Sequence, residues 1–130
     1  MQNNTLAIKL SEINFCWGSA KNDFQLEVKK FQLEKNESVI LVGPSGGGKS
    51  TLLSLICGIV KPRNGIIEIL GQNLEEMSNT ERDSFRADNI GIIFQQFNLL
   101  PYLSALDNVL LPLEFSFPRK KASGEIKEKL

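Results

Sequence analysis

The sequence contains no histidine, which excludes catalysis and metal binding through imidazole groups. It has only two cysteines, Cys16 and Cys57, too few for a disulfide framework. No uninterrupted apolar run reaches the ~18 residues typical of a membrane-spanning helix, and the chain starts without a cationic, apolar export signal. We therefore expect a soluble, cytoplasmic protein.

The charge of the chain shows no excess of either sign. Lys and Arg together number 15, as do Asp and Glu, so the formal net charge is zero. This balance argues against a nucleic-acid partner held by a general positive field. The length of 130 residues and the hydrophobic fraction of 42% are typical of one globular domain with a real core.

Alternation of apolar and polar residues predicts two strands near the start of the chain. The alternation has one phase over residues 6–10 and the shifted phase over 13–17, which indicates an irregularity near Ser11 and Glu12. A second alternating stretch covers 24–33, after a small, polar segment that is typical of a turn. We expect these strands to be antiparallel and partly exposed.

Apolar runs predict buried elements further along. Residues 39–42 are an unbroken apolar run that favours a strand buried on both faces. The apolar residues within 90–94 predict another buried strand, and 66–70 favours a further strand. Residues 50–60 are nearly all apolar and long enough for a buried helix, which Pro62 would end. The fold class that we expect is α/β.

Local signals predict further helices. The Ser-x-x-acid pattern at 78–81 and again at 104–107 is typical of helix starts. Pro112 and Pro118 predict an irregular stretch, and the charged residues 120–130 predict the beginning of another helix.

The sharpest motif is the glycine-rich segment 43–51, which matches the pattern G-x-x-x-x-G-K-[ST]. Consecutive glycines allow positive φ angles, and their amides can form an anion-binding nest at a helix N-terminus. Lys49 can reach the β- and γ-phosphates of a nucleotide, and Ser50 can ligate Mg²⁺. A flexible linker is disfavoured because a predicted buried strand precedes the segment and a predicted helix follows it. The predicted phosphate-binding residues are Gly43, Pro44, Ser45, Gly46, Gly47, Gly48, Lys49, Ser50 and Thr51.

A wider set of residues resembles the ATP-binding subunits of ATP-binding-cassette (ABC) transporters. The set comprises the loop 43–51 with Leu52 and Leu53, then Gly58-Ile59, Lys61-Pro62, Gly65, Gly71 and the segment 90–95, Ile-Gly-Ile-Ile-Phe-Gln. Residues 97–109 resemble the branch that serves lipoprotein release and macrolide export. The resemblance covers essentially the whole chain and implies a P-loop NTPase core with an N-terminal antiparallel β subdomain.

The resemblance also implies roles for single residues, with ATP and Mg²⁺ as cofactors. Trp17 would stack on adenine, since stacking needs only a flat ring at the pocket mouth; the alternative is a strand residue that faces the core. Gln95 would contact Mg²⁺ and the attacking water and, with Lys49, serve catalysis, because an amide offers both a donor and an acceptor. Gln96 adjoins Gln95 and leaves the assignment open by one position.

By the same resemblance, residues 1–94 hold the β subdomain together with the nucleotide-binding core, and 95–130 hold the glutamine loop and the start of the helical subdomain. We find no Walker B strand ending in Asp-Glu, no signature sequence and no switch histidine. The chain therefore resembles the N-terminal portion of such a subunit, truncated in the helical subdomain. We expect little or no ATPase activity from it alone, because phosphoryl transfer depends on positioning groups that are absent.

The resemblance implies two partners for the complete protein, a transmembrane permease subunit that docks on 97–109 and a second ATP-binding subunit in a head-to-tail dimer. The protein would lie on the inner face of the cell membrane and couple ATP binding and hydrolysis to movement of a substrate. Two alternatives stay open: a catalytically inactive nucleotide-binding remnant or interaction module, and an unrelated P-loop NTPase or kinase. The Phe94-Gln95 segment argues against an unrelated P-loop NTPase or kinase.

Overall fold

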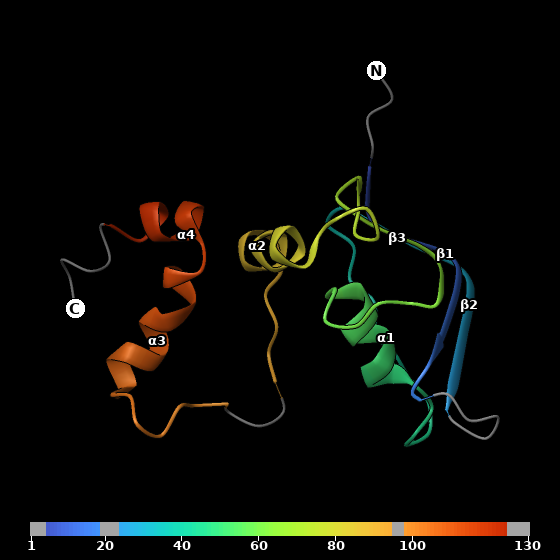
Figure 1. The fold of residues 1–130 in the computed structure, drawn as a ribbon, viewed down its shortest axis with the longest axis horizontal. Helices are drawn as coiled ribbons and strands as arrows, with labels where there is room; N and C mark the ends of the chain where they lie inside the picture. The colour runs from blue at the N-terminus through green and yellow to red at the C-terminus, as the bar shows by residue number, and fades with distance from the viewer. Residues whose placement is uncertain (1–4, 19–23, 95–97, 125–130) are drawn as a thin grey trace. The chain divides into compact units, whose positions relative to one another are not determined.

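The chain consists of two compact units, Met1–Ser78 and Asn79–Leu130. The computed structural model describes residues 5–18, 24–94 and 98–124 (Figure 1). The first unit holds all the assigned strands and one helix, and the second holds helices. The functional division after residue 94 that the sequence suggests stays a prediction.

A four-stranded antiparallel sheet forms the first unit. Its strands are β1 (Leu6–Cys16), β2 (Gln25–Glu34), β3 (Asn64–Ile69) and β4 (Gln72–Asn73), in the order β2-β1-β3-β4 (Figure 1). The alternating side chains of β1 and β2 produce this pairing, because one face of each strand is apolar and the other polar. The antiparallel, partly exposed start of the chain is confirmed.

The irregularity in β1 lies at the predicted place. Glu12 has a left-handed φ of 51°, and the register between β1 and β3 shifts between Ser11 and Asn14. Gly65 faces this bulge with a φ of 104°, so close that a Cβ on it would lie 2.5 Å from the carbonyl oxygen of Glu12. The bulge thus depends on a partner residue without a side chain.

The core of the first unit lies between the sheet and α1 (Lys49–Ile56), which contacts β3. Apolar side chains from the two strands β1 and β3, the helix and the turn after β4 are buried there. They are Leu10, Ile13, Phe15, Leu55, Ile67, Ile69 and Leu74. This core fixes the start of α1 relative to the sheet, and the glycine-rich loop directly precedes that helix.

The helix α1 is shorter than the apolar run predicts, because Gly58 ends it. Gly58 has a φ of 65°. Its N–H bonds the carbonyl of Leu55 at 3.0 Å, and the N–H of Ile59 bonds that of Ser54 at 2.9 Å. This is a Schellman motif, so the helix ends at Ile56, and the prediction that Pro62 ends it was wrong.

The two apolar runs predicted as buried strands are not strands in this structure. Residues 39–42 and 90–94 lie outside the sheet, and Ile40 is 85% exposed and Ile93 100% exposed. A strand is buried on both faces only when neighbouring strands pair with it. No strand of the described residues pairs with either segment, so none of their apolar side chains is fully buried.

The described residues of the second unit form the helices α2 (Asn79–Asn89), α3 (Ala105–Glu114) and α4 (Phe117–Ala122). Hydrogen bonds of 2.6 Å from Ser116 to Asp88 and of 3.1 Å from Arg119 to the carbonyl of Ile90 join α4 to the end of α2. None of the helices in the described part of the chain is both long and apolar enough to cross a membrane.

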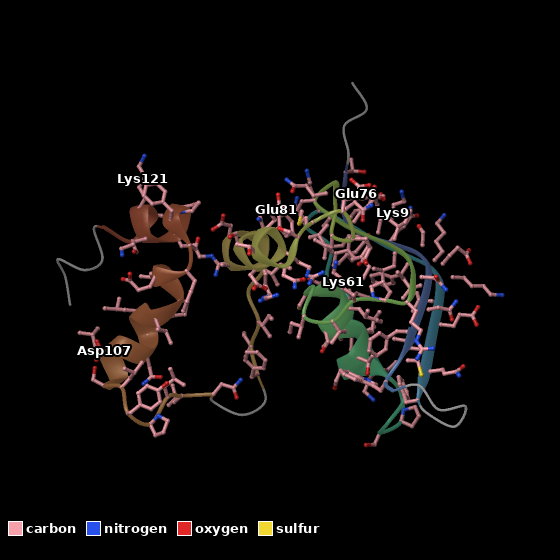
Figure 2. All side chains as sticks on the ribbon, viewed as in Figure 1. Lys9, Lys61, Glu76, Glu81, Asp107 and Lys121 are labelled. Carbon is pink, nitrogen blue, oxygen red and sulfur yellow. The ribbon has the colours of Figure 1, made fainter. Side chains whose placement is uncertain are left out.

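The helix starts follow the predicted caps. The helix α2 begins directly after Ser78. At α3 the Ser104 hydroxyl accepts from the N–H of Asp107 at 3.1 Å and donates to its carboxylate at 2.6 Å. Asp107, labelled in Figure 2, lies in the first turn of α3. Its negative charge is stabilising there, because the N-terminus of a helix carries a partial positive charge.

The prediction of an irregular stretch around Pro112 and Pro118 was wrong. Pro112 lies inside α3, which continues to Glu114, and Pro118 lies in the first turn of α4. A first-turn proline loses no hydrogen bond, since the amides there have no helical partner. Pro112 does remove one backbone bond, and the cap at Ser104 helps to offset that loss.

Asn108 fixes the turn that precedes α3. Its side-chain amide donates to the carbonyls of Leu100, Leu103 and Ser104 at 3.1, 3.3 and 3.0 Å, and its oxygen accepts from the N–H of Leu100 at 2.7 Å. One partly buried side chain thus satisfies both polar groups of the Leu100 backbone and ties the loop to the helix.

The variant Asn108→Ala is expected to destabilise the second unit by about 2 kcal/mol, because partly buried backbone groups lose their partners. Exchange of the Leu100 amide hydrogen, followed by NMR, should accelerate about 30-fold, as that free energy implies. Asn89→Ala is the matched control, since the Asn89 side-chain amide lies in the same unit and donates at 2.9 Å to the carbonyl of Phe85, not to the Leu100 turn. Equal protection of Leu100 in Asn108→Ala and the wild type would contradict the assignment.

Candidate functional site

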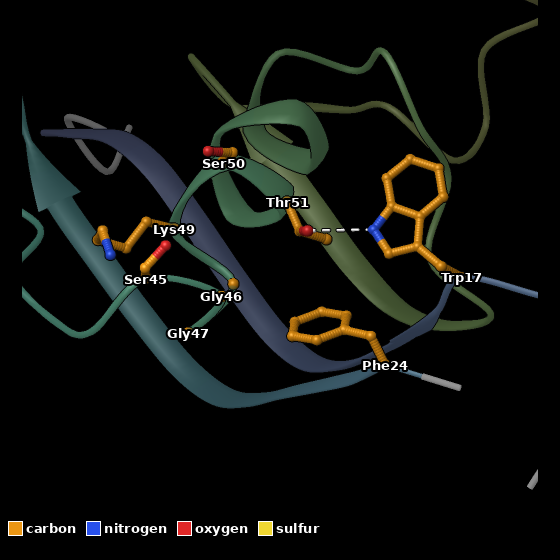
Figure 3. A pocket seen from close by; sticks show the side chains of 9 residues that line it. Trp17, Phe24, Ser45, Gly46, Gly47, Lys49, Ser50 and Thr51 are labelled. Carbon is orange, nitrogen blue, oxygen red and sulfur yellow. Dashed lines mark hydrogen bonds between the residues drawn. The ribbon is translucent and has the colours of Figure 1, made fainter. Parts of the chain in front are cut away.

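A pocket of about 410 Å³ opens at the start of α1 (Figure 3). Its volume falls within the range of small-ligand sites. Its walls come from the end of β1, the residue before β2, and the loop and first turn of α1. The lining residues are Trp17, Phe24, Ser45, Gly46, Gly47, Gly48, Lys49, Ser50 and Thr51.

The glycine-rich loop has the backbone that its sequence predicts. Gly46 and Gly48 have φ angles of 77° and 87°, and the N–H of Gly47 bonds the carbonyl of Pro44 at 3.2 Å. Gly48 is the N-cap residue of α1 and provides no side-chain cap. The first amides of the helix are therefore open toward the pocket, as a phosphate-binding helix start requires.

Lys49 bridges the loop. Its Nζ donates to the carbonyl of Gly43 at 2.8 Å and to that of Pro44 at 2.7 Å. An ammonium group has three N–H donors, so one remains for a ligand. Among the described residues that line the pocket, Lys49 alone carries a charge, and the local field there favours an anion.

Trp17 forms the opposite wall of the pocket (Figure 3). The side chain is 50% exposed, whereas Phe15 on the same strand is only 7% exposed. The alternative interpretation of Trp17 as a core residue was therefore wrong. Its indole Nε1 donates to the hydroxyl of Thr51 at 3.1 Å, and its ring meets that of Phe15 edge to face, with centroids 5.0 Å apart.

Phe24 is a pocket residue that the sequence interpretation missed. Its ring lies beside the loop, and a Cβ on Gly48 would be 2.8 Å from the Phe24 Cζ atom. The Leu26 Cδ1 atom lies 3.2 Å from the same Cβ position. The alternating pattern placed Phe24 on a strand, and no local signal connects it with a glycine 24 positions later.

The predicted metal and catalytic residues are only partly described. Ser50 lies in the first turn of α1 at the pocket (Figure 3). Mg²⁺ commonly takes one or two protein oxygens, completing its shell with waters and substrate phosphates, and the Ser50 hydroxyl suits that role. Gln95 and its neighbour Gln96 lie outside the described residues.

A model of the ABC transporter family matches residues 26–130, which is most of the chain. The chain belongs to the ABC transporter family. An ABC transporter ATP-binding protein of Mycobacterium tuberculosis is 42% identical over 110 residues, which cover 84% of this chain and 44% of that protein. The lipoprotein-releasing system ATP-binding protein LolD of Hydrogenovibrio crunogenus is 43% identical over 64% of this chain and 36% of its own length.

A solved structure of this ABC family supports the same fold. The ATP-binding cassette MJ0796 of Methanocaldococcus jannaschii, solved as a dimer in a post-hydrolysis state with ADP and Pi, matches with a TM-score of 0.77 and 37% identity. The match covers 83% of this chain and 47% of that one. The expected fold, a P-loop ATPase core with an antiparallel β region, is confirmed, and the chain spans less than half the length of these relatives.

Proposed function

We propose that the chain binds ATP with Mg²⁺ in the pocket between Trp17 and the glycine-rich loop. The observation that supports this proposal is the contrast between the two walls of the pocket. One wall is aromatic and the other is polar and positively charged, which matches the base and the phosphates of a nucleotide. Open amides and Lys49 suit phosphates, and an exposed aromatic ring suits a base. The relatives named as ATP-binding proteins and the ADP in the MJ0796 structure support this assignment.

In this proposal each part of the loop has one role. Amides of the loop and of the first turn of α1 hold the phosphate oxygens, and Lys49 neutralises charge on the β- and γ-phosphates. The Ser50 hydroxyl ligates Mg²⁺, and the ion supplies further charge stabilisation at the phosphates. In the complete protein Gln95 would contact Mg²⁺ and orient the attacking water.

We propose further that this chain acts as the ATP-binding part of a transporter, with a transmembrane subunit and a second ATP-binding subunit as partners. The name of the lipoprotein-releasing relative LolD supports a role in transport. The segment tied by Asn108 presents Leu99, Tyr102 and Val109 at 65%, 77% and 69% exposure, an apolar surface suited to such a partner. Hydrolysis would need the Walker B, signature and histidine groups that the sequence lacks, so the chain alone binds ATP without turnover.

The variant Gly48→Ala tests the loop geometry. A Cβ at a φ of 87° disfavours the left-handed backbone by about 1–2 kcal/mol and would press on the Phe24 ring. We expect Mg-ATP affinity to fall about tenfold, measured by the fluorescence of Trp17, the chain's single tryptophan. Gly124→Ala is the control, because nothing lies within 4 Å of its Cβ position. Unchanged affinity in Gly48→Ala would contradict the assignment.

A further inference from the structure

The hydrogen bond between Trp17 and Thr51 joins the two ends of the pocket. Trp17 lies just beyond β1, and Thr51 lies in the first turns of α1, 34 positions later in the chain (Figure 3). The indole Nε1 donates to the Thr51 hydroxyl at 3.1 Å. Thr51 follows Ser50 directly, so the aromatic wall is tied to the same helical turn that follows the phosphate loop.

The remaining contacts of Trp17 leave its ring orientation incompletely fixed. The backbone N–H of Trp17 bonds the carbonyl of Phe24 at 3.2 Å, which holds the main chain but not the side chain. The edge-to-face contact with Phe15, at an interplanar angle of 84°, supports one side of the ring. Half of the side chain is in solvent, so the Thr51 hydroxyl supplies the directional restraint that solvent cannot.

We propose that Thr51 is a positioning residue that acts through Trp17, holding the indole at a fixed place and angle opposite the phosphate loop. This inference rests on the proposed function, in which a base stacks on Trp17. Stacking gains most when the ring is already ordered, because binding then loses less side-chain freedom. A ring without a suitably placed N–H cannot make this bond, so Trp17 and Thr51 form a matched pair.

The test uses the whole chain with Thr51→Val, which removes the hydroxyl and keeps the branched shape, and Thr51→Ser, which retains the hydroxyl. The chain has one tryptophan, so its indole N–H gives a single NMR signal. We expect Thr51→Val to shift this signal and to accelerate its hydrogen exchange without any nucleotide. Thr51→Ser should restore the wild-type signal. An identical signal in Thr51→Val and the wild type would overturn the proposal.

Affinity for Mg-ATP supplies the second readout. The loss of affinity caused by Thr51→Val should be about threefold larger in the wild-type background than in a Trp17→Phe background. Phenylalanine has no N–H, so in that background there is no hydrogen bond to residue 51 for the substitution to remove. Direct effects of the hydroxyl on phosphate cancel in this comparison. Inorganic tripolyphosphate, which has no base, should show no such difference between the two backgrounds. Equal effects of Thr51→Val on Mg-ATP in both backgrounds would overturn positioning through Trp17.

The two readouts separate this inference from the proposed function. If the wild-type chain binds neither Mg-ATP nor tripolyphosphate, the proposed function fails and the positioning role fails with it, whatever the indole signal shows. If the chain binds Mg-ATP but the two backgrounds respond alike, only the positioning role fails. A shifted indole N–H signal in Thr51→Val, together with a loss of Mg-ATP affinity that is larger with Trp17 than with Phe at that position, supports both the proposed function and the positioning role.

Discussion

The variant Lys49→Ala is expected to weaken Mg-ATP binding roughly 10- to 100-fold. Lys49 is the one charged side chain among the described residues of the pocket, and hydrogen bonds to charged groups typically contribute about 1.5–3 kcal/mol. Its Nζ already donates to the carbonyls of Gly43 and Pro44 at 2.8 and 2.7 Å, which holds the ammonium over the loop before a ligand arrives. Alanine removes both the charge and this bridge.

Isothermal titration of the chain with Mg-ATP measures this loss directly. Lys61→Ala is the matched control, because Lys61 (Figure 2) is exposed, belongs to the same unit and lies outside the pocket lining. A general effect of net charge would weaken both variants equally, since each loses one positive charge. Equal affinity of Lys49→Ala and the wild type for Mg-ATP would contradict the assignment of residues 43–51 as the phosphate-binding loop.

The second large effect is expected for the stability of the first unit in Gly65→Ala. A Cβ at this position would lie 2.5 Å from the carbonyl oxygen of Glu12 and 2.7 Å from the Cα of Ile13. These are backbone atoms in the middle of β1, so the strand itself must move. The φ of 104° adds further strain for any residue other than glycine. Together these predict a loss of about 3 kcal/mol or more.

Urea unfolding followed by Trp17 fluorescence gives the change in the free energy of unfolding. Gly43→Ala is the control in the same unit, because its Cβ would meet nothing within 4 Å and its φ is not positive. That variant should unfold at nearly the wild-type urea concentration. A similar midpoint for Gly65→Ala and Gly43→Ala would show that β1 accommodates the added carbon, contrary to the geometry.

Features set by neighbouring residues could be predicted from the sequence. The irregularity at Glu12 follows from a phase change in the alternation, and the cap of α3 follows from Ser104 and Asp107, three positions apart. The glycine-rich loop follows from its motif, since glycine, lysine and serine spacing determines where the amides and Nζ can lie. In each case the interacting groups are close in the chain.

Features set by distant residues could not be predicted in this way. The runs 39–42 and 90–94 have the composition of buried strands, yet burial needs pairing partners that a local pattern cannot supply. The contact of Phe24 with Gly48 and the bond from Trp17 to Thr51 arise from how β1, β2 and α1 come together. The early end of α1 is different, because Gly58 is itself a local stop signal from which that end can be predicted.

The exposed segment 39–42 has a thermodynamic consequence for the pocket. It leads without interruption into Gly43, and Ile40 and Val42 are 85% and 87% exposed. Any strand that pairs with this segment orders the backbone that enters the phosphate loop. If the loop binds ATP as proposed, strand pairing and ATP binding are linked reciprocally. The factor by which pairing raises the affinity for ATP is then the factor by which ATP raises the affinity for the pairing strand.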